Sequence, residues 1–390
     1  MSLTKDEKTA EETYKKLLAL DPAHKDALYN LANLKYRQSQ IAEAQSLYQR
    51  LITTHPTFAT AYVNLAKTYS DTADTKSAET LLRKALQIDP HHTYAHWNLS
   101  HILLHAQQWQ EGWREYEARL QLPNWLQPPV TAPAWHGESE PRRILLWNDQ
   151  GIGDAIQFLR YPKLLADRGH EVWVLVQDSL KKLASTAPGV TGALGPSDPF
   201  PAFDAQAPLL SMPHRLSLPE PTSSTPYLKT KTIMDIPRRA GHRAVGLVWA
   251  GNRHHKNDAN RSASLADLHP LFIAPNIDWF SLQFGDTSAQ IRQNNLSETI
   301  HDLSHRLHDF AATASALSAL DLLITIDTSV AHLAGALNIP CYLMLSTTPD
   351  WRWAGEDKTT AWYPSLRLFR QQTSGDWRSI ATRIAALLSK

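Results

Sequence analysis

Three prolines stand 34 residues apart near the start of the chain: Pro22, Pro56 and Pro90. Each of them ends an amphipathic stretch whose apolar residues have the spacing of a helix. A period of this length is typical of stacked helix pairs, because one pair cannot bury its apolar face alone. The first third of the chain is therefore predicted to be an α-helical solenoid.

The repeated blocks match the tetratricopeptide pattern, with a leucine in the first helix and a small residue in the second that lets the paired helices approach. The recurring residues are Leu31, Leu65 and Leu99, followed by Ala44, Ala78 and Gly112. We expect about three and a half repeats over residues 6–122, with the chain beginning in the middle of a repeat.

An asparagine also recurs with this period, at the sixth position of each first helix: Asn30, Asn64 and Asn98. An amide side chain carries a donor and an acceptor, which suits it to bracketing a peptide bond of an extended ligand. Such a ladder resembles the one in O-linked N-acetylglucosamine transferases, where it grips the acceptor backbone. The alternative is that these asparagines cap neighbouring turns.

Composition limits the classes of partner. The chain is 43% hydrophobic and 20% charged, and its net charge of +1 argues against a nucleic-acid footprint. The single cysteine, Cys341, rules out a disulfide framework and favours a reducing compartment. No stretch reaches the roughly 18 apolar residues of a membrane span, so we expect a soluble, cytoplasmic protein, as in bacteria.

A proline-rich linker is expected over residues 123–140, and beyond it short apolar runs alternate with helical stretches, as in parallel sheets. We expect an N-terminal Rossmann-like lobe at 141–237 and a C-terminal lobe at 238–390 that ends in a closing helix. Two such lobes in series suggest the α/β GT-B architecture, with the active site in the cleft between the lobes. The expected strands are 144–147, 172–176, 244–249, 279–282, 322–326 and 341–345.

The first strand of the first lobe leads into a loop with Gly151, Gly153 and Asp154. Glycines let the backbone approach a ligand, but two glycines alone are a weak dinucleotide signal. A carboxylate at a helix N-terminus would repel a pyrophosphate, so Asp154 fits a base that faces an acceptor hydroxyl. The alternative is an ordinary helix N-cap.

In the second lobe, the strand 322–326 is followed at once by Asp327, Thr328 and Ser329. This turn lies at the carboxyl end of a strand and at a helix N-terminus, where free amides attract phosphate. His332 shares one helical face with Thr328 and Ser329. The alternative for His332 is a core histidine.

A polar loop leaves the first strand of the second lobe, where Lys256 and Arg261 are predicted to neutralise a departing diphosphate in place of a metal. A solvated loop is the alternative. The chain contains no Asp-x-Asp, so no metal is expected to be required. The other candidates for the nucleotide-sugar site are Trp249, Gly251, Asn252 and, more weakly, Gln283.

The loop 151–154, the turn 327–334 and the stretch 249–252 together resemble the heptosyltransferase-like (glycosyltransferase family nine) domain fused behind tetratricopeptide repeats. The resemblance implies an inverting GT-B enzyme that uses a nucleotide sugar, with Asp154 as the base. Lys256 lies near the family's phosphate-binding lysine, and Asp327, Thr328, Ser329 and His332 match its nucleotide-sugar turn. Ser329 stands where heptosyltransferases have glycine, so a heptose donor does not carry over.

The predicted function is transfer of a sugar from a nucleotide sugar to a hydroxyl of a protein or peptide that the repeats present. One alternative is a lipid-linked or polysaccharide acceptor, with the repeats recruiting other partners. Another is a degenerate transferase that serves as a binding scaffold.

Overall fold

The computed structural model describes residues 5–222, 225–255, 257–355 and 358–390. The chain divides into two compact units, residues 1–126 and 127–390, so the division falls inside the proline-rich segment. Each unit is described by itself below.

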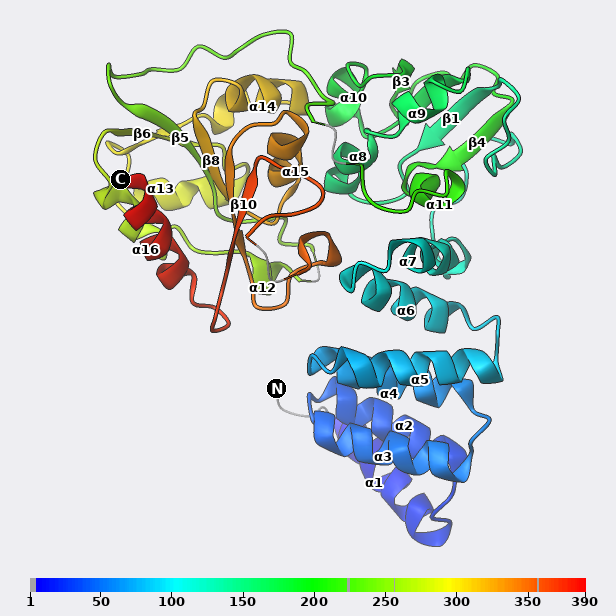
Figure 1. Ribbon diagram of the computed structural model, residues 1–390. Coiled ribbons are helices and arrows are strands. Elements are labelled where there is room, and N and C mark those ends of the chain that lie inside the picture. Colours follow the sequence, from blue (N-terminus) through cyan, green and yellow to red (C-terminus); the bar gives the residue numbers. More distant parts are fainter. Residues whose placement is uncertain (1–4, 223–224, 256, 356–357) are drawn as a thin grey trace. The chain divides into compact units, whose positions relative to one another are not determined.

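The first unit consists of consecutive helices, shown in blue to cyan in Figure 1. They are α1 (Lys5–Leu20), α2 (Lys25–Arg37), α3 (Ile41–Thr54), α4 (Ala59–Asp71), α5 (Thr75–Ile88), α6 (Thr93–His105) and α7 (Trp109–Tyr116), followed by a 3-10 turn (Glu117–Gln121). The helices α2, α4 and α6 begin 34 residues apart, at Lys25, Ala59 and Thr93, which confirms the predicted repeat period.

The recurring residues form the core of this unit. Leu65 and Ala78 are fully buried, and so are their repeat equivalents to within a few per cent. A Cβ on Gly112 would lie 2.8 Å from the Leu104 side chain, so the small residue is required where α7 packs on α6. The packing confirms the prediction that small residues at this position let paired helices approach.

The second unit contains two parallel sheets, visible in Figure 1. The first has the order β3-β2-β1-β4 and is built from β1 (Arg143–Trp147), β2 (Glu171–Leu175), β3 (Val190–Leu194) and β4 (Ala205–Pro208). The helices that connect its strands are α8 (Ile152–Phe158), α9 (Pro162–Ala166), α10 (Asp178–Ala184) and α11 (Met212–Arg215). Strand β1 is central and buried, as its apolar run predicted.

The second sheet has six strands in the order β10-β9-β8-β5-β6-β7. The strands are β5 (Arg243–Val248), β6 (Ile277–Ser281), β7 (Ile300–Asp302), β8 (Leu322–Ile326), β9 (Cys341–Leu345) and β10 (Leu366–Arg370). Its helices are α12 (Asp258–Arg261), α13 (Gln290–Gln293), α14 (Phe310–Leu317), α15 (Ser329–Ala336) and α16 (Trp377–Leu388). The range of α16 equals that of the expected closing helix, and its apolar face packs into the core of this sheet.

Both sheets are wound in two directions from a central strand, and the winding reverses between β1 and β4 and between β5 and β8. Ligands of open α/β sheets bind outside the carboxyl ends of the strands at such reversal points. The loops after β1, β5 and β8 contain the candidate residues of the sequence, so the topology places them where a ligand is expected.

Four strands were not predicted, namely β3, β4, β7 and β10. The apolar run of β3 is broken by Gly192, β4 has only four residues and ends in proline, and β7 has three residues. The helical stretch that follows β1 is divided into two short helices, α8 and α9, because Pro162 starts a new helix.

The segment before the expected boundary at 237/238 already contacts the six-stranded part. The amides of Tyr227 and Leu228 donate to the carbonyl of Ala336 at 3.0 and 3.2 Å, and the amide of Met234 donates to the carbonyl of Ser315. The crossover chain is therefore packed along α14 and α15.

A buried arginine at the end of α8 joins the same segments. The Arg160 guanidinium donates to the carbonyls of Gln157, Thr222 and Trp362 and to the hydroxyl of Tyr227. Only 4% of Arg160 is exposed, and its guanidinium lies over the rings of Tyr227, Trp362 and Tyr363 at 4.8 to 5.2 Å.

We expect the substitution Gly335→Ala in α15 to destabilise the protein, because an added Cβ would lie 2.3 Å from the buried ring of Tyr363. Overpacking of a core typically costs about 1 to 3 kcal/mol, and urea denaturation measures the change in the free energy of unfolding. In a Tyr363→Leu background the added methyl should cost clearly less. An equal cost in both backgrounds would contradict this account of the glycine.

Candidate functional site

The loop after β1 holds Asp154 by two contacts. Gly151 is the N-cap of α8 and Asp154 is the third residue of the helix, where its Oδ2 accepts a hydrogen bond from the Gly151 amide at 3.0 Å. Its Oδ1 accepts from Nη2 of Arg352. Asp154 therefore does not occupy the N-cap position, although it does satisfy an amide of the helix start.

Arg352 was not predicted from the sequence. It lies in a 3-10 turn, Trp351–Trp353, after β9, and only 9% of it is exposed. Its Nε donates to Oε1 of Gln157 in α8 at 2.8 Å and its Nη1 donates to Oδ1 of Asp350 at 2.8 Å. The Trp-Arg-Trp triplet is an unusual signal in a loop, but it has no periodicity that would have pointed to this role.

Gly153 allows α8 to approach α15 closely. A Cβ at this position would lie 3.0 Å from Cδ2 of His332 and 3.5 Å from Cα of Ser329. A side chain there would push the two helices apart, because His332 is itself buried. The structure thus brings the Gly151–Asp154 loop of one sheet against the Asp327–His332 turn of the other.

The turn after β8 begins with Asp327, and Thr328 is the N-cap of α15. Burial and then the charge of Asp350 raise the pKa of Asp327 to about 6, although the Trp353 side chain, Arg261 and Arg352 act in the opposite direction. Asp154 has a raised pKa for the same reason, since burial outweighs the opposing effect of Arg352. The two carboxyl groups share the field of one guanidinium.

His332 is enclosed by aromatic rings. Its Nδ1 lies 3.0 Å from the Tyr363 hydroxyl, and its ring stacks on Trp353 with centroids 5.0 Å apart. Burial, followed by the charges of Arg352 and Arg160, lowers its pKa to about 3, although the charge of Asp350 opposes the shift. The imidazole is therefore neutral near pH 7, and it is buried, as the core alternative expected.

The loop after β5 is folded around Arg261 and Ser262. The amide of Gly251 donates to Oγ of Ser262 at 2.9 Å, and a Cβ on Gly251 would lie 2.8 Å from Nη2 of Arg261. Arg261 pairs with Asp258 at 3.5 Å. Asn252 Oδ1 accepts from the amide of His254 at 3.0 Å, and Lys256 lies outside the described residues.

The charges of Asp154 and Asp350 act on His255, which lies in this loop. Its pKa is lowered, first by burial and then by Arg261, while the charges of Asp154 and Asp350 oppose the shift. The loop after β5 therefore belongs to the same electrostatic neighbourhood as Asp154.

Two predicted ligand residues are engaged with the protein itself. Gln283 Oε1 accepts from the amides of Trp249 and Ala250 at 3.1 and 2.9 Å, and its Nε2 donates to the carbonyl of Ala250 at 3.1 Å. Trp249 is fully buried and its Nε1 donates to Gln290 at 3.1 Å. Both residues hold the loop after β5 in place.

The three asparagines lie at the sixth positions of α2, α4 and α6. None of them caps a helix, since the caps of α2 and α6 are His24 and His92. Asn64 Nδ2 donates to Oδ1 of Asn33 at 3.0 Å, which also accepts from the hydroxyl of Tyr48 at 2.6 Å. Asn64 therefore links neighbouring repeats, and none of the three asparagines is the N-cap of its own helix.

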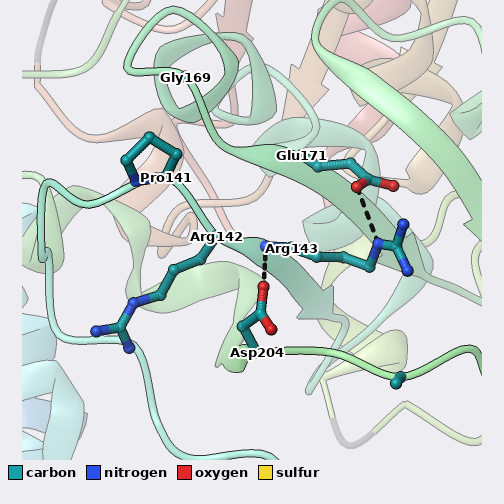
Figure 2. A pocket seen from close by; sticks show the side chains of 7 residues that line it. Pro141, Arg142, Arg143, Gly169, Glu171 and Asp204 are labelled. Atoms are coloured by element: carbon teal, nitrogen blue, oxygen red, sulfur yellow. Dashed lines mark hydrogen bonds and ion pairs between the residues drawn. The ribbon is translucent and has the colours of Figure 1, made fainter.

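An open pocket of about 420 Å³ lies at the opposite, amino-terminal end of β1 and β2 (Figure 2). Its lining residues are Pro141, Arg142, Arg143, Gly169, Glu171, Ala202 and Asp204. Figure 2 shows Arg143 bonded to Glu171 and to Asp204, at 2.9 and 2.8 Å. None of the predicted site residues lines this pocket.

Neither a metal-ligand cluster nor a membrane-spanning helix is found among the described residues. They contain no group of three or more histidine, cysteine or acidic side chains arranged to hold a metal ion. No helix in this part of the chain combines the length and the apolarity needed to cross a bilayer.

We expect His332 to make the protein acid-sensitive. A folded pKa of about 3, below the ordinary 6.5, means that its contribution to stability is present above pH 6.5 and is lost as the pH falls. Between pH 7 and pH 5 this loss is about 2 kcal/mol. His332→Gln should show a correspondingly smaller fall in the free energy of unfolding, measured by urea denaturation at each pH.

The exposed His308, whose side chain is 73% accessible, serves as the control. His308→Gln should leave the pH dependence unchanged. Asp327, whose pKa is raised, acts with the opposite sign over this range, so the difference between wild type and variant carries the test. Identical pH profiles of His332→Gln and wild type would contradict the assignment.

Models of the tetratricopeptide repeat match residues 4–67 and 59–92 of the chain, so the first unit consists of tetratricopeptide repeats. Among solved structures, MamA from Desulfovibrio magneticus RS-1 is 21% identical over 30% of this chain and 64% of its own, with a TM-score of 0.26. YrrB, whose title describes a TPR protein with an unusual peptide-binding site, is 18% identical over 29% of this chain and 58% of its own, with a TM-score of 0.27. Superpositions this partial carry no argument about function.

A curated relative extends beyond the repeats. Protein FlbA of Caulobacter vibrioides is 25% identical in an alignment of 329 positions that covers 74% of this chain and 53% of that protein. The chain thus spans about half of the length of this relative. The similarity covers more residues than the repeat unit contains, so it includes part of the α/β unit.

Proposed function

We propose that the protein is an inverting, metal-independent glycosyltransferase that moves a sugar from a nucleotide sugar to a hydroxyl of a protein or peptide. One observation carries the proposal. The candidate base Asp154, from the loop after β1, lies in one cluster with the phosphate-attracting turn Asp327–Ser329 after β8, on the other sheet. A transferase needs an acceptor site and a donor site that lie close together in space.

The topology supports a GT-B arrangement. Each parallel sheet reverses its winding next to the strand whose loop holds candidate residues, β1 in one sheet and β5 with β8 in the other. A donor bound at the β5/β8 reversal point would face an acceptor near the β1 loop. Gly153 and His332 are in contact across this region, so the two sites are adjacent.

The proposed binding site for the donor diphosphate is the N-terminus of α15. The first amides of a helix lack intrahelical partners, and Thr328 and Ser329 add hydroxyl groups, although the amide of Ala331 already donates to the carbonyl of Thr328 at 3.0 Å. Arg261, whose side chain is 17% accessible, lies in the neighbouring loop and supplies positive charge. No metal is invoked, because these groups and the predicted contribution of Lys256 meet the charge of the leaving group.

The reaction is a single displacement. Asp154 takes the proton of the acceptor hydroxyl, and the acceptor oxygen forms a bond to the anomeric carbon of the sugar. The bond from this carbon to the diphosphate oxygen breaks, and its electron pair leaves with the nucleoside diphosphate. Attack from the face opposite the leaving group inverts the configuration at the anomeric carbon.

The repeats are proposed to bind the acceptor. The side chains of Asn30 and Asn98, half-buried at equivalent positions of α2 and α6, make no hydrogen bond to another described residue, whereas Asn64 uses its Nδ2 as a donor to Asn33. Amides at a regular spacing suit the regular spacing of peptide groups in an extended chain. The engagement of Asn64 with Asn33 supports the recruitment alternative, in which the acceptor is a lipid-linked or polysaccharide sugar.

A catalytically degenerate scaffold is the second candidate. The observation that favours it is the engagement of Asp154 with both Gly151 and Arg352, which is also what a purely structural carboxylate would show. Binding of UDP, GDP, ADP and CMP, measured by calorimetry, separates the two. A chain that binds none of them at millimolar concentration lacks the donor site and is not a nucleotide-sugar transferase.

We expect Asp154→Asn to reduce sugar transfer at least 100-fold, because the amide cannot accept the proton. Donor turnover is measured with the nucleotide sugar whose nucleoside diphosphate binds best. Nucleotide affinity should not decrease, and the melting temperature should change little, because the amide oxygen still accepts from Gly151. Full activity of the variant would contradict the role of Asp154 as the base.

We expect the triple change of Asn30, Asn64 and Asn98 to alanine to raise the apparent KM for a protein acceptor at least tenfold. Each lost amide contact is worth about 0.5 to 1.5 kcal/mol. Initial rates at sub-saturating acceptor, with donor affinity measured in parallel, provide the test.

Two controls accompany the triple variant. Asn33→Ala removes the contact with Asn64 and should lower stability without affecting KM to the same extent. Gln49→Ala with Gln87→Ala removes two exposed amides from the second helices and should change nothing. Wild-type rates of the folded triple variant would favour the recruitment alternative.

A further inference from the structure

Arg352 is the residue on which the two halves of the candidate site depend. Each of its guanidinium nitrogens has one acceptor, namely Gln157 Oε1 for Nε, Asp350 Oδ1 for Nη1 and Asp154 Oδ1 for Nη2. Two of these acceptors lie in α8, next to one sheet, whereas Arg352 itself follows β9 of the other. One cation therefore decides the environment of the candidate base.

Acidic and basic side chains meet around Arg352. Asp149, Asp350 and Arg352 act on Asp154, and Asp350, Arg261 and Arg352 act on Asp327. A diphosphate that entered beside Asp327 would add about two negative charges next to these acids. It needs a cation, and Arg352 already interacts electrostatically with Asp327 and His332 at the start of α15.

A carboxylate that is paired with a guanidinium is also a poor base, because the cation stabilises its ionised form. Asp154 must lose this partner before it can draw a proton from an acceptor. Movement of Arg352 to the diphosphate would meet both needs, because it would supply a cation to the diphosphate and release Asp154 from its partner.

A buried donor beside Arg352 points to a ligand. Gln157 is fully buried, and the Nε2 of its side chain has no acceptor among the described residues. The amide cannot be turned round, because its Oε1 must face the Nε–H of Arg352. An oxygen-rich ligand bound by Arg352 would also offer Gln157 its missing acceptor.

The surroundings of Arg352 allow its head group to be redirected. The guanidinium lies over the ring of Trp351, 4.0 Å from the centroid. An aromatic face stabilises a cation without fixing one direction of its N–H groups, unlike a bidentate carboxylate.

We propose that Arg352 is a shared cation, which neutralises Asp154 in the empty site and turns to the diphosphate of the donor when the donor binds. The proposal rests on the proposed function and adds the order of events: the base becomes available only when the donor is in place. Arg352 is thus a diphosphate ligand and, for Asp154, a positioning residue.

The test is a double-mutant cycle on nucleoside diphosphate binding, measured by calorimetry with the best-binding member of the UDP, GDP, ADP and CMP panel and with its nucleoside alone. Arg352→Gln should weaken diphosphate binding at least tenfold and leave nucleoside binding unchanged. Asp154→Asn should strengthen diphosphate binding several-fold, because the diphosphate no longer competes for Arg352. In the Arg352→Gln background this gain should largely vanish.

The matched control is Arg143→Lys, which alters a paired arginine at the amino-terminal end of β1 and should not change binding. Arg352→Lys provides a second variant if the glutamine variant does not fold, and it should also weaken diphosphate binding because a point charge cannot bridge the same acceptors. An equal gain from Asp154→Asn in both backgrounds, or undiminished diphosphate affinity in the Arg352 variants, would overturn the proposal while leaving the proposed function intact. Absence of nucleotide binding by the wild type would instead overturn the proposed function.

Discussion

The α/β unit depends on the buried guanidinium of Arg160. A cation away from water is costly unless its donors find acceptors, and here three backbone carbonyls and the Tyr227 hydroxyl supply them. Two of those carbonyls, of Thr222 and Trp362, lie in segments distant in sequence. Because Arg160 donates hydrogen bonds to carbonyls of all these segments, it holds together the end of α8, the segment around Thr222 and the segment around Trp362 before β10. The close contact of Gly153 with His332 follows from this arrangement.

The periodic features of the structure were predictable and the irregular ones were not. The repeat register was predicted from Pro22, Pro56 and Pro90, and strands β8 and β9 from apolar runs that are bounded by turns, because a period or a run is a property of the sequence itself. Strand β7 has three residues and no such signal. The loops that hold Asp154 and Asp327 were identified because they follow predicted strands. Arg352 was missed because its role depends on α8, which comes almost 200 residues earlier.

Asp154 and Asp327 are the same residue type but lie in different surroundings. Burial raises the pKa of both Asp154 and Asp327. Asp154 has a direct guanidinium partner, Arg352, and a backbone donor, Gly151. The pKa of Asp327 is instead lowered by the Trp353 side chain and then by the more distant charges of Arg261 and Arg352. These different surroundings suit the two acids to the different roles proposed for them, Asp154 as the base and Asp327 in the nucleotide-sugar turn. The histidine next to them is kept neutral by the aromatic rings of Trp353 and Tyr363, so it adds no charge to the cluster.

The long separation between Asp154 and Arg352 also matters during synthesis on the ribosome. The repeats contact chiefly their neighbours in the chain and can fold as they emerge, whereas Asp154 waits for 198 further residues before its partner exists. At a synthesis rate of about 5 to 20 residues per second, this delay is about 10 to 40 seconds. A message cut short before codon 352 would encode every repeat and no complete site. Such a truncated product would keep the proposed acceptor-binding surface and lack the proposed catalytic site.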